Sequence, residues 1–135
     1  MPERVAARAL ARAHGAVTFR QVSFGYEPAH PVLHDVSLAV EPGTRVAITG
    51  TTGAGQTTLG SLLTRFYDPT EGAILLDGVD LREYRVADLR AQFAVVLQQP
   101  VLFSATIAEN IAYGRPGAPA RDIAAAARAA NAHDF

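Results

Sequence analysis

The residues best suited to chemistry form one glycine-rich run, Gly50-Thr51-Thr52-Gly53-Ala54-Gly55-Gln56-Thr57-Thr58. Its spacing is that of a phosphate-binding loop, G-x-x-x-x-G-K-[ST], with glutamine at the lysine position. The three glycines allow backbone conformations in which several N–H groups surround phosphate oxygens. Thr57 is expected to place its hydroxyl on Mg²⁺, and Thr58 to reach an inner phosphate. A glycine-rich turn without a ligand is the alternative that these nine residues alone leave open.

Such a loop needs a strand before it and a helix after it, and the sequence predicts both. Residues 45–49 (RVAIT) are a short β-branched run typical of a buried strand, and they lead directly into Gly50. Beyond the glycines, apolar residues recur at helical spacing, at Leu59, Leu62, Leu63 and Phe66. The helix is expected to stop before Asp68-Pro69. Its N-terminal N–H groups and positive dipole end would face the same phosphates.

The remaining segments predict a small antiparallel sheet followed by alternating strands and helices. Residues 16–22 and 36–40 alternate apolar and polar side chains, as half-buried strands do. Residues 24–35 between them are expected to form a loop, punctuated by Gly25, Pro28 and Pro31. Later elements are expected as a strand at 73–76, a turn at Asp77-Gly78, a short helix at 86–90, a buried strand at 93–97 and a helix at 120–130. This order indicates an α/β fold with a parallel sheet.

Composition narrows the class of protein. Hydrophobic residues make up 49% and charged residues 19% of the 135 residues, with a net charge of -1, which is typical of a globular chain and gives no reason to expect nucleic acid as a partner. Cysteine is absent, so disulfides and thiolate metal sites are excluded. No apolar run approaches the length of a membrane span, and a cytoplasmic location is expected. Residues 1–14 suggest either a linker or a short helix.

The segment that leads into the glycine-rich loop resembles the nucleotide-binding domain of ABC transporters. Residues 22–50, VSFGYEPAHPVLHDVSLAVEPGTRVAITG, are similar to the opening segment of that domain. The resemblance implies that Tyr26 stacks on the adenine of ATP, because a flat ring offers a π-face to a base. A loop tyrosine that packs over a strand is the alternative interpretation of Tyr26.

Two later segments extend the resemblance nearly to the last residue. Residues 71–90, EGAILLDGVDLREYRVADLR, are similar to the hairpin and short helix that precede the Q-loop of this family. Residues 93–114, FAVVLQQPVLFSATIAENIAYG, are similar to the Q-loop region, and the phrase LFSATIAENI is most like exporter-type domains. The resemblance implies that Gln98 ligates Mg²⁺ and senses the γ-phosphate. A glutamine that merely ends a strand is the alternative.

The resemblance carries expectations for domains, partners and location. It implies a P-loop NTPase core with an N-terminal antiparallel β subdomain, in which residues 1–14 are a linker from a transmembrane domain and residues 15–135 are a partial ATP-binding domain. The expected partners are ATP, the transmembrane domain of an exporter and a second nucleotide-binding domain in a head-to-tail dimer. The domain would then lie peripherally at the cytoplasmic face of a membrane.

Two departures from the family pattern limit the activity that is expected. Gln56 stands at the position of the P-loop lysine, so a neutral amide replaces a cation beside the phosphates. The signature LSGGQ, the Walker B strand, the D-loop and the switch histidine are not present in these 135 residues, and no catalytic residue is predicted. We therefore expect an ATP-binding part of an exporter ATPase. The alternatives are a degenerate module that binds nucleotide without hydrolysing it and a fragment without independent function.

Overall fold

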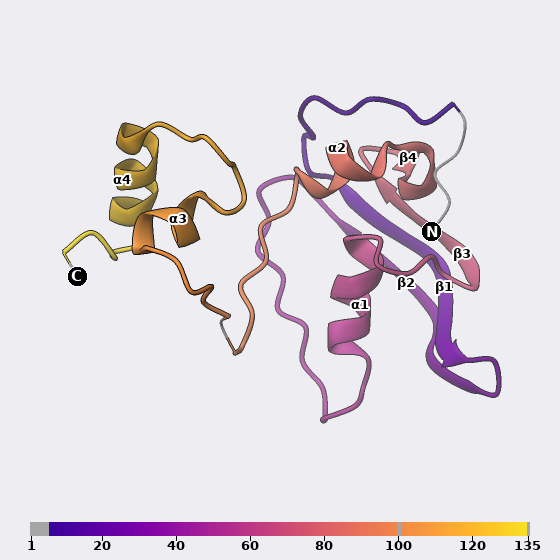
Figure 1. The fold of residues 1–135 in the computed structure, drawn as a ribbon. Coiled ribbons are helices and arrows are strands. Elements are labelled where there is room, and N and C mark those ends of the chain that lie inside the picture. The colour runs from indigo at the N-terminus through magenta and orange to yellow at the C-terminus, as the bar shows by residue number, and fades with distance from the viewer. Residues whose placement is uncertain (1–5, 100, 135) are drawn as a thin grey trace. The chain divides into compact units, whose positions relative to one another are not determined.

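The computed structural model describes residues 6–99 and 101–134, and the chain forms two compact units that divide between Ala94 and Val95. The first unit contains a four-stranded sheet, helix α1 and two short helices (Figure 1). The second unit contains helices α3 and α4. Each unit has its own internal hydrogen bonds and is described separately below.

The sheet of the first unit is antiparallel throughout, with strand order β2-β1-β3-β4. Its long hairpin consists of β1 (Val17–Glu27) and β2 (His30–Val40). On the other side of β1 lie β3 (Glu71–Leu76) and the short β4 (Val79–Asp80). The turn predicted at Asp77-Gly78 joins these two strands and is confirmed. The expected antiparallel sheet at the start of the domain is therefore present.

Helix α1 (Gln56–Leu63) lies over one face of this sheet (Figure 1). Leu62 is fully buried in one cluster with Phe19, Val22 and Ile74, and Leu59 and Leu63 pack against that cluster. The helix ends at Leu63, before the predicted limit at Asp68-Pro69, because Arg65 adopts a left-handed conformation with φ +53. Phe66, which the helical spacing included, consequently lies outside the helix and is exposed.

The core closes against two short helices, η1 (Leu81–Glu83) and α2 (Val86–Arg90). Leu81 and Leu89 are buried in the same cluster as the sheet residues. The short helix that the sequence predicts at 86–90 is confirmed with the same bounds. These two helices thus close the core at the end of the sheet opposite to the β1–β2 turn.

The loop predicted at 24–35 is wrong, because both strands of the hairpin continue through it and only Pro28 and Ala29 form the turn. Gly25 is tolerated inside β1 because the pairing is irregular there, and a Cβ at this position would lie 2.7 Å from the carbonyl oxygen of His30. Pro31 is tolerated because β2 is the edge strand of the sheet, where a missing N–H leaves no neighbour unpaired.

The strands predicted at 45–49 and 93–97 are also wrong, and the described residues contain no parallel sheet. Both runs have strand-like composition, but β-structure depends on a partner strand to satisfy the backbone groups. Neither run has such a partner within the described part of the chain. The side chains of Val46 and Ile48, two positions apart, nevertheless line an apolar cavity of about 220 Å³ between the sheet and α1.

The segment before β1 is tied to the unit along residues 77–92. The backbone N–H of Arg8 donates to the Glu83 carbonyl, and Arg8 accepts from the N–H of Arg85. Leu10 and Ala13 donate their N–H groups to the side chains of Asp88 and Gln92. Residues 6–14 form no helix, so that alternative is wrong for the described part of the segment, and residues 1–5 lie outside the described residues.

Asp77 fastens the end of this segment to the sheet. Its carboxylate accepts backbone N–H groups from His14 at 2.7 Å and from Gly15 and Ala16 at 2.9 Å. Partial burial raises the pKa of Asp77, but the three backbone hydrogen bonds outweigh it and hold the pKa below its usual value. The charged form is thus favoured in the folded chain.

Acidification is expected to weaken this fastening. Because the folded pKa is depressed, the contribution of Asp77 to stability is full above the ordinary aspartate pKa near 3.8 and is lost as the pH falls below it. Asp77→Asn should cost roughly 1–2 kcal/mol at pH 7, a modest value because the carboxylate is partly solvated. Urea unfolding at pH 7 and pH 3 measures this. The variant should lose less stability between the two pH values than the parent chain or the control Glu41→Gln, and equal losses would contradict the assignment.

The second unit is organised by α3 (Ile107–Ala112) and α4 (Ala120–Ala129). Thr106 and Glu109 form a capping box at the start of α3, and Asn110 bonds back to the backbone of Phe103. The helix predicted at 120–130 is confirmed apart from its last residue. Helix α3 was not predicted, although the pattern T-x-x-E at 106–109 carries its start signal.

An exposed apolar segment precedes α3, and it bears on solubility. Val96 is 97% exposed, and large parts of the other apolar side chains are open to solvent at Val95, Leu97, Val101, Leu102 and Phe103. We expect the 135-residue chain to aggregate on heating instead of melting cooperatively. Exposed apolar patches on two molecules associate when the molecules collide. Light scattering and far-UV circular dichroism during a thermal ramp measure both processes. Val96→Glu should delay the scattering, whereas a sharp cooperative melt of the monomeric parent would refute the expectation.

Candidate functional site

The glycine-rich loop is anchored at its end by close contact with the hairpin. Gly55 has φ +92 and is the cap residue before α1. A Cβ on Gly55 would lie 2.7 Å from Leu33 Cδ2 and 3.3 Å from Val32 Cγ1. Only glycine therefore combines this left-handed conformation with such a close approach to β2. The start of α1 is fixed in place by that contact.

The N-terminus of α1 is left open toward solvent. Its cap residue offers no side chain, and its first turn contains no acidic residue. The first N–H groups of a helix have no partner inside the helix, and the helix dipole adds positive potential there. Thr57 is exposed at this end of the helix, whereas Thr58 is only 5% exposed. The arrangement favours an anion in front of Thr57.

Two internal hydrogen bonds shape the loop. The N–H of Ala54 donates to the carbonyl of Thr51 at 3.0 Å. The side-chain amide of Gln56 donates from Nε2 to the carbonyl oxygen of Gly50 at 3.2 Å, which joins the two ends of the loop. Gln56 is half-buried and neutral, so it contributes a donor but no positive charge.

Tyr26 lies beside the loop, near the end of β1. Its hydroxyl is 3.2 Å from Thr58 Oγ1, a hydrogen bond that either oxygen can donate. The side chain is 54% exposed, and two further rings, those of Phe24 and Tyr67, contact it. The loop and the hairpin thus bring an accessible aromatic ring to the start of α1.

These features enclose a pocket of about 240 Å³ within the first unit. It is lined by Tyr26, Val32, Gly53, Gly55, Gln56, Thr57 and Thr58. The structure therefore brings together six of the residues predicted from the sequence. Gly50, Thr51, Thr52 and Ala54 belong to the same loop but do not line this pocket.

Sequence reasoning missed Val32 and Tyr67 as neighbours of the site. Val32 lines the pocket because β1 and β2 pair through to the turn, with Gly25 opposite Pro31. A prediction of a continuous hairpin would have placed Val32 near Tyr26. The glycine and prolines at 24–35 favoured a loop instead, so the hairpin was not predicted there. For Tyr67, the sequence offers only an aromatic pair after a helix, which carries no information on its partner across the fold.

Gln98 belongs to the second unit, outside any helix or strand, and it is exposed. The described residues also contain no group of three or more His, Cys, Asp or Glu side chains that could hold a metal ion. The assignment of Gln98 to a site with Thr57 therefore stays a prediction.

Two further groups in the first unit, the side chains of Arg82 and Tyr84, have shifted pKa values, and both lie at the edge of the sheet near β4 and η1. Hydrogen bonds from Arg82 to the Asp80 carboxylate raise the pKa of the guanidinium, although burial opposes this. Burial raises the pKa of the Tyr84 hydroxyl, which donates to the carbonyl of Leu76. These groups hold β4 and η1 in place and do not line the pocket.

A family model described as ABC transporter matches residues 33–135, which is most of the chain. The chain belongs to the ABC transporter family. It corresponds to the N-terminal part of the ATP-binding domain of ABC transporters, as the sequence resemblance predicted.

Individual ABC transporters are similar over nearly all of the chain. The fatty acid ABC transporter ATP-binding/permease protein of Mycobacterium bovis is 52% identical over 121 residues, which cover 90% of this chain and 19% of that protein. The ATP-dependent lipid A-core flippase of Alkalilimnicola ehrlichii is 51% identical over 130 residues, which cover 95% of this chain and 22% of the flippase. This chain therefore spans about a fifth of the length of these relatives.

A solved structure of an ABC exporter agrees with the fold. The structure of a bacterial Atm1-family ABC exporter with ATP bound superposes with a TM-score of 0.93 at 46% identity, and it covers 100% of this chain and 24% of the exporter chain. The described residues of this chain contain no helix with the length and apolar character of a membrane span.

Proposed function

We propose that the first unit binds ATP between Tyr26 and the loop Gly50–Thr58. The observation that carries this proposal is the shared pocket, in which an exposed ring and the open N-terminus of α1 face the same space. The ring of Tyr26 would stack on adenine, which requires a π-face but no matched hydrogen bonds. The N–H groups of the loop and of the first turn of α1 would receive the phosphates.

Mg²⁺ fits the same site as an oxygen-bound cation. The exposed hydroxyl of Thr57 is a hard oxygen donor at the mouth of the pocket, and Mg²⁺ prefers such ligands together with phosphate oxygens and water. Gln98 is proposed as a second oxygen ligand. When bound, the ion would neutralise part of the phosphate charge. Thr57 and the loop amides would hold the nucleotide in position for it.

We further propose that this domain works within a longer exporter. Its partners would be a transmembrane domain and a second nucleotide-binding domain in a head-to-tail dimer at the cytoplasmic face of a membrane. The support comes from the relatives, which are named as an ATP-binding/permease protein and a flippase, and this chain matches only part of each. The transported substrate would be determined by segments outside this chain.

One observation favours a second candidate function, a module that binds nucleotide without hydrolysing it. Gln56 carries no charge, and its amide is already bonded to Gly50. A lysine at this position would add positive charge where the transferred phosphoryl group develops negative charge. The loop of this chain can therefore hold phosphates more readily than it can promote their transfer.

The proposal predicts a base-dependent loss of affinity when Tyr26 is removed. Tyr26→Ala should weaken ATP binding roughly five- to a hundredfold, because stacking of one base on an aromatic ring contributes about 1–3 kcal/mol. Titration of the chain with a fluorescent ATP analogue, with and without Mg²⁺, measures the dissociation constant. Tyr26→Phe retains the ring but loses the hydrogen bond to Thr58, so it should bind ATP more tightly than Tyr26→Ala.

The controls separate stacking from general damage. Tyr113→Ala removes an exposed tyrosine of the second unit, which stacks on Phe103, and should leave ATP binding unchanged. Absence of any binding to the parent chain at millimolar nucleotide would refute the proposed site. Equal binding by the parent and Tyr26→Ala would refute the role of the ring.

A further inference from the structure

Three aromatic rings form a closed cluster at the rim of the pocket. The ring centroids of Phe24 and Tyr26 lie 5.1 Å apart, those of Tyr26 and Tyr67 5.2 Å apart, and those of Phe24 and Tyr67 5.5 Å apart. Phe24 and Tyr26 are two positions apart on β1, whereas Tyr67 comes from the segment that follows α1. Each ring therefore contacts both others, although two different parts of the fold supply them.

We propose that Tyr67 is a positioning residue for Tyr26 and fixes the ring on which the base stacks. The inference rests on the proposed function of Tyr26. Its basis is geometric: the Tyr67 ring stands at 88° to the Tyr26 ring, and the Phe24 ring at 84°. Neither neighbouring ring is stacked parallel on the Tyr26 ring. The two neighbours therefore restrict the rotation of that ring but do not take the stacked position that a base would occupy.

The hydroxyl of Tyr26 supplies the other constraint. It is hydrogen-bonded to Thr58, a buried residue in the first turn of α1, so the tip of the side chain is tied to the phosphate loop. Of the two rings that contact Tyr26, Phe24 is buried and Tyr67 is 43% exposed. Without Tyr67, the Tyr26 ring could turn about its remaining contacts. The base would then meet a ring in several orientations instead of one.

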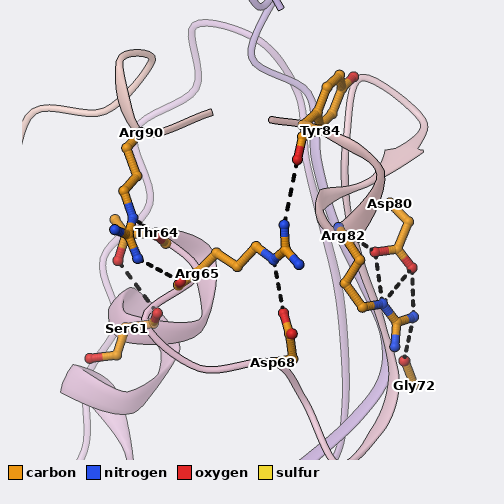
Figure 2. A network of polar contacts seen from close by, with 9 residues as sticks. All are labelled: Ser61, Thr64, Arg65, Asp68, Gly72, Asp80, Arg82, Tyr84 and Arg90. Atoms are coloured by element: carbon orange, nitrogen blue, oxygen red, sulfur yellow. Dashed lines mark hydrogen bonds and ion pairs between the residues drawn. The ribbon is translucent and has the colours of Figure 1, made fainter. Parts of the chain in front are cut away.

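Tyr67 can act in this way because its own backbone is anchored on the α1 side. Arg65 is 3% exposed, and its guanidinium donates to Asp68 at 3.0 Å and to the carbonyl of Tyr84 at 3.5 Å (Figure 2). Arg90 donates to the carbonyls of Thr64 and Arg65 at 3.2 Å and 2.9 Å (Figure 2). These bonds fix the chain on both sides of Tyr67.

A second anchor joins the same segment to β1 below the ring cluster. The N–H and the hydroxyl of Thr70 both donate to the carbonyl oxygen of Ser23, at 3.0 Å and 2.7 Å. Ser23 directly precedes Phe24, so the segment that presents Tyr67 and the strand that presents Tyr26 are held together next to the rings. The position of Tyr67 is consequently set by contacts within the fold.

Competition experiments with two ligands test the proposal. Tyr67→Ala should weaken binding of the fluorescent ATP analogue roughly two- to tenfold, the value of one aromatic contact. The same variant should bind inorganic tripolyphosphate, measured by displacement of the analogue, as the parent does. Tyr67→Phe keeps the ring contact and should restore ATP binding, and Tyr113→Ala should behave as the parent.

Two results would overturn the proposal. Unchanged ATP binding by Tyr67→Ala would remove the positioning role, and equal losses for ATP and tripolyphosphate would assign Tyr67 a merely structural role. A readout without nucleotide keeps the test independent of the proposed function. In chain labelled with 3-fluorotyrosine, Tyr67→Ala should shift or broaden the ¹⁹F resonance of Tyr26, whereas an unchanged resonance would refute the contact even if ATP failed to bind.

Discussion

Gln56→Lys is expected to tighten ATP binding roughly ten- to a hundredfold, because a hydrogen bond to a charged group contributes about 1.5–3 kcal/mol. In the present chain the Gln56 amide closes the loop on Gly50 and offers no charge to a phosphate. A lysine ammonium is a compact cation with three donors, which suits the outer phosphates of a nucleotide. Its effect should appear chiefly in ligands that carry those phosphates, so AMP should gain little.

The chain allows an unusually direct measurement of this effect. All 12 basic side chains of the sequence are arginine, so Gln56→Lys introduces the only lysine. Its dissociation constants for ATP and AMP can be compared with those of the parent at two salt concentrations, since a charged contact weakens as salt increases. Bound ATP should also protect the new amine from an amine-reactive label.

Gln56→Met is the matched control, because it keeps the length of the side chain but supplies neither charge nor donor. It should bind ATP no more tightly than the parent. If Gln56→Lys bound ATP with the affinity of the parent, or if its amine were labelled equally with and without ATP, the side chain at position 56 would not face the phosphates.

Gly72→Ala is expected to destabilise the first unit by about 3–5 kcal/mol, a large part of the stability of a typical domain. Gly72 has φ +77, a conformation that costs an L-residue about 1–2 kcal/mol. A Cβ would also collide with the backbone oxygens of Arg20 and Gln21, at the bulge of β1 beside β3. Backbone atoms in a paired strand cannot move aside as the end of a flexible side chain can.

Two other glycines separate these causes. Gly78 has φ +79 but open space where a Cβ would lie, so Gly78→Ala should show only the conformational cost. Gly60 lies inside α1 with no atom near the added Cβ, and Gly60→Ala should stabilise by about 0.5–1 kcal/mol. Pulse proteolysis in urea gives all three values at low protein concentration. A cost for Gly72→Ala no larger than that for Gly78→Ala would mean that the bulge relaxes without strain.

Local structure was predictable from the sequence wherever the residues of a single segment determine it. The spacing from Gly50 to Thr58 predicted a loop before a helix, and the structure places α1 from Gln56. The apolar spacing of Leu59, Leu62 and Leu63 predicted the buried face of that helix. The end of the helix was less predictable, because the left-handed conformation of Arg65 depends on its buried contacts with Asp68 and Tyr84.

Features that depend on distant segments could not be predicted in the same way. Gly25 and Pro31 carry turn signals, but the hairpin tolerates one at an irregular pairing and the other on an edge strand. The run 45–49 has the composition of a strand and lacks a pairing neighbour among the described residues. The contact of Tyr26 with Tyr67 joins positions far apart in the chain, and no local pattern encodes it.

The glycine-rich loop at 50–58 is held unequally at its two ends, which affects how it would receive a ligand. Gly55 is wedged against β2 and Thr58 is bonded to Tyr26, but residues 44–50 pair with no strand in the part of the chain that the structure describes. Ordering a residue costs about 1–2 kcal/mol of conformational entropy. A strand paired with residues 44–50 would bear this entropy cost before a nucleotide binds. Such pairing would raise the affinity for nucleotide without adding a contact to the ligand.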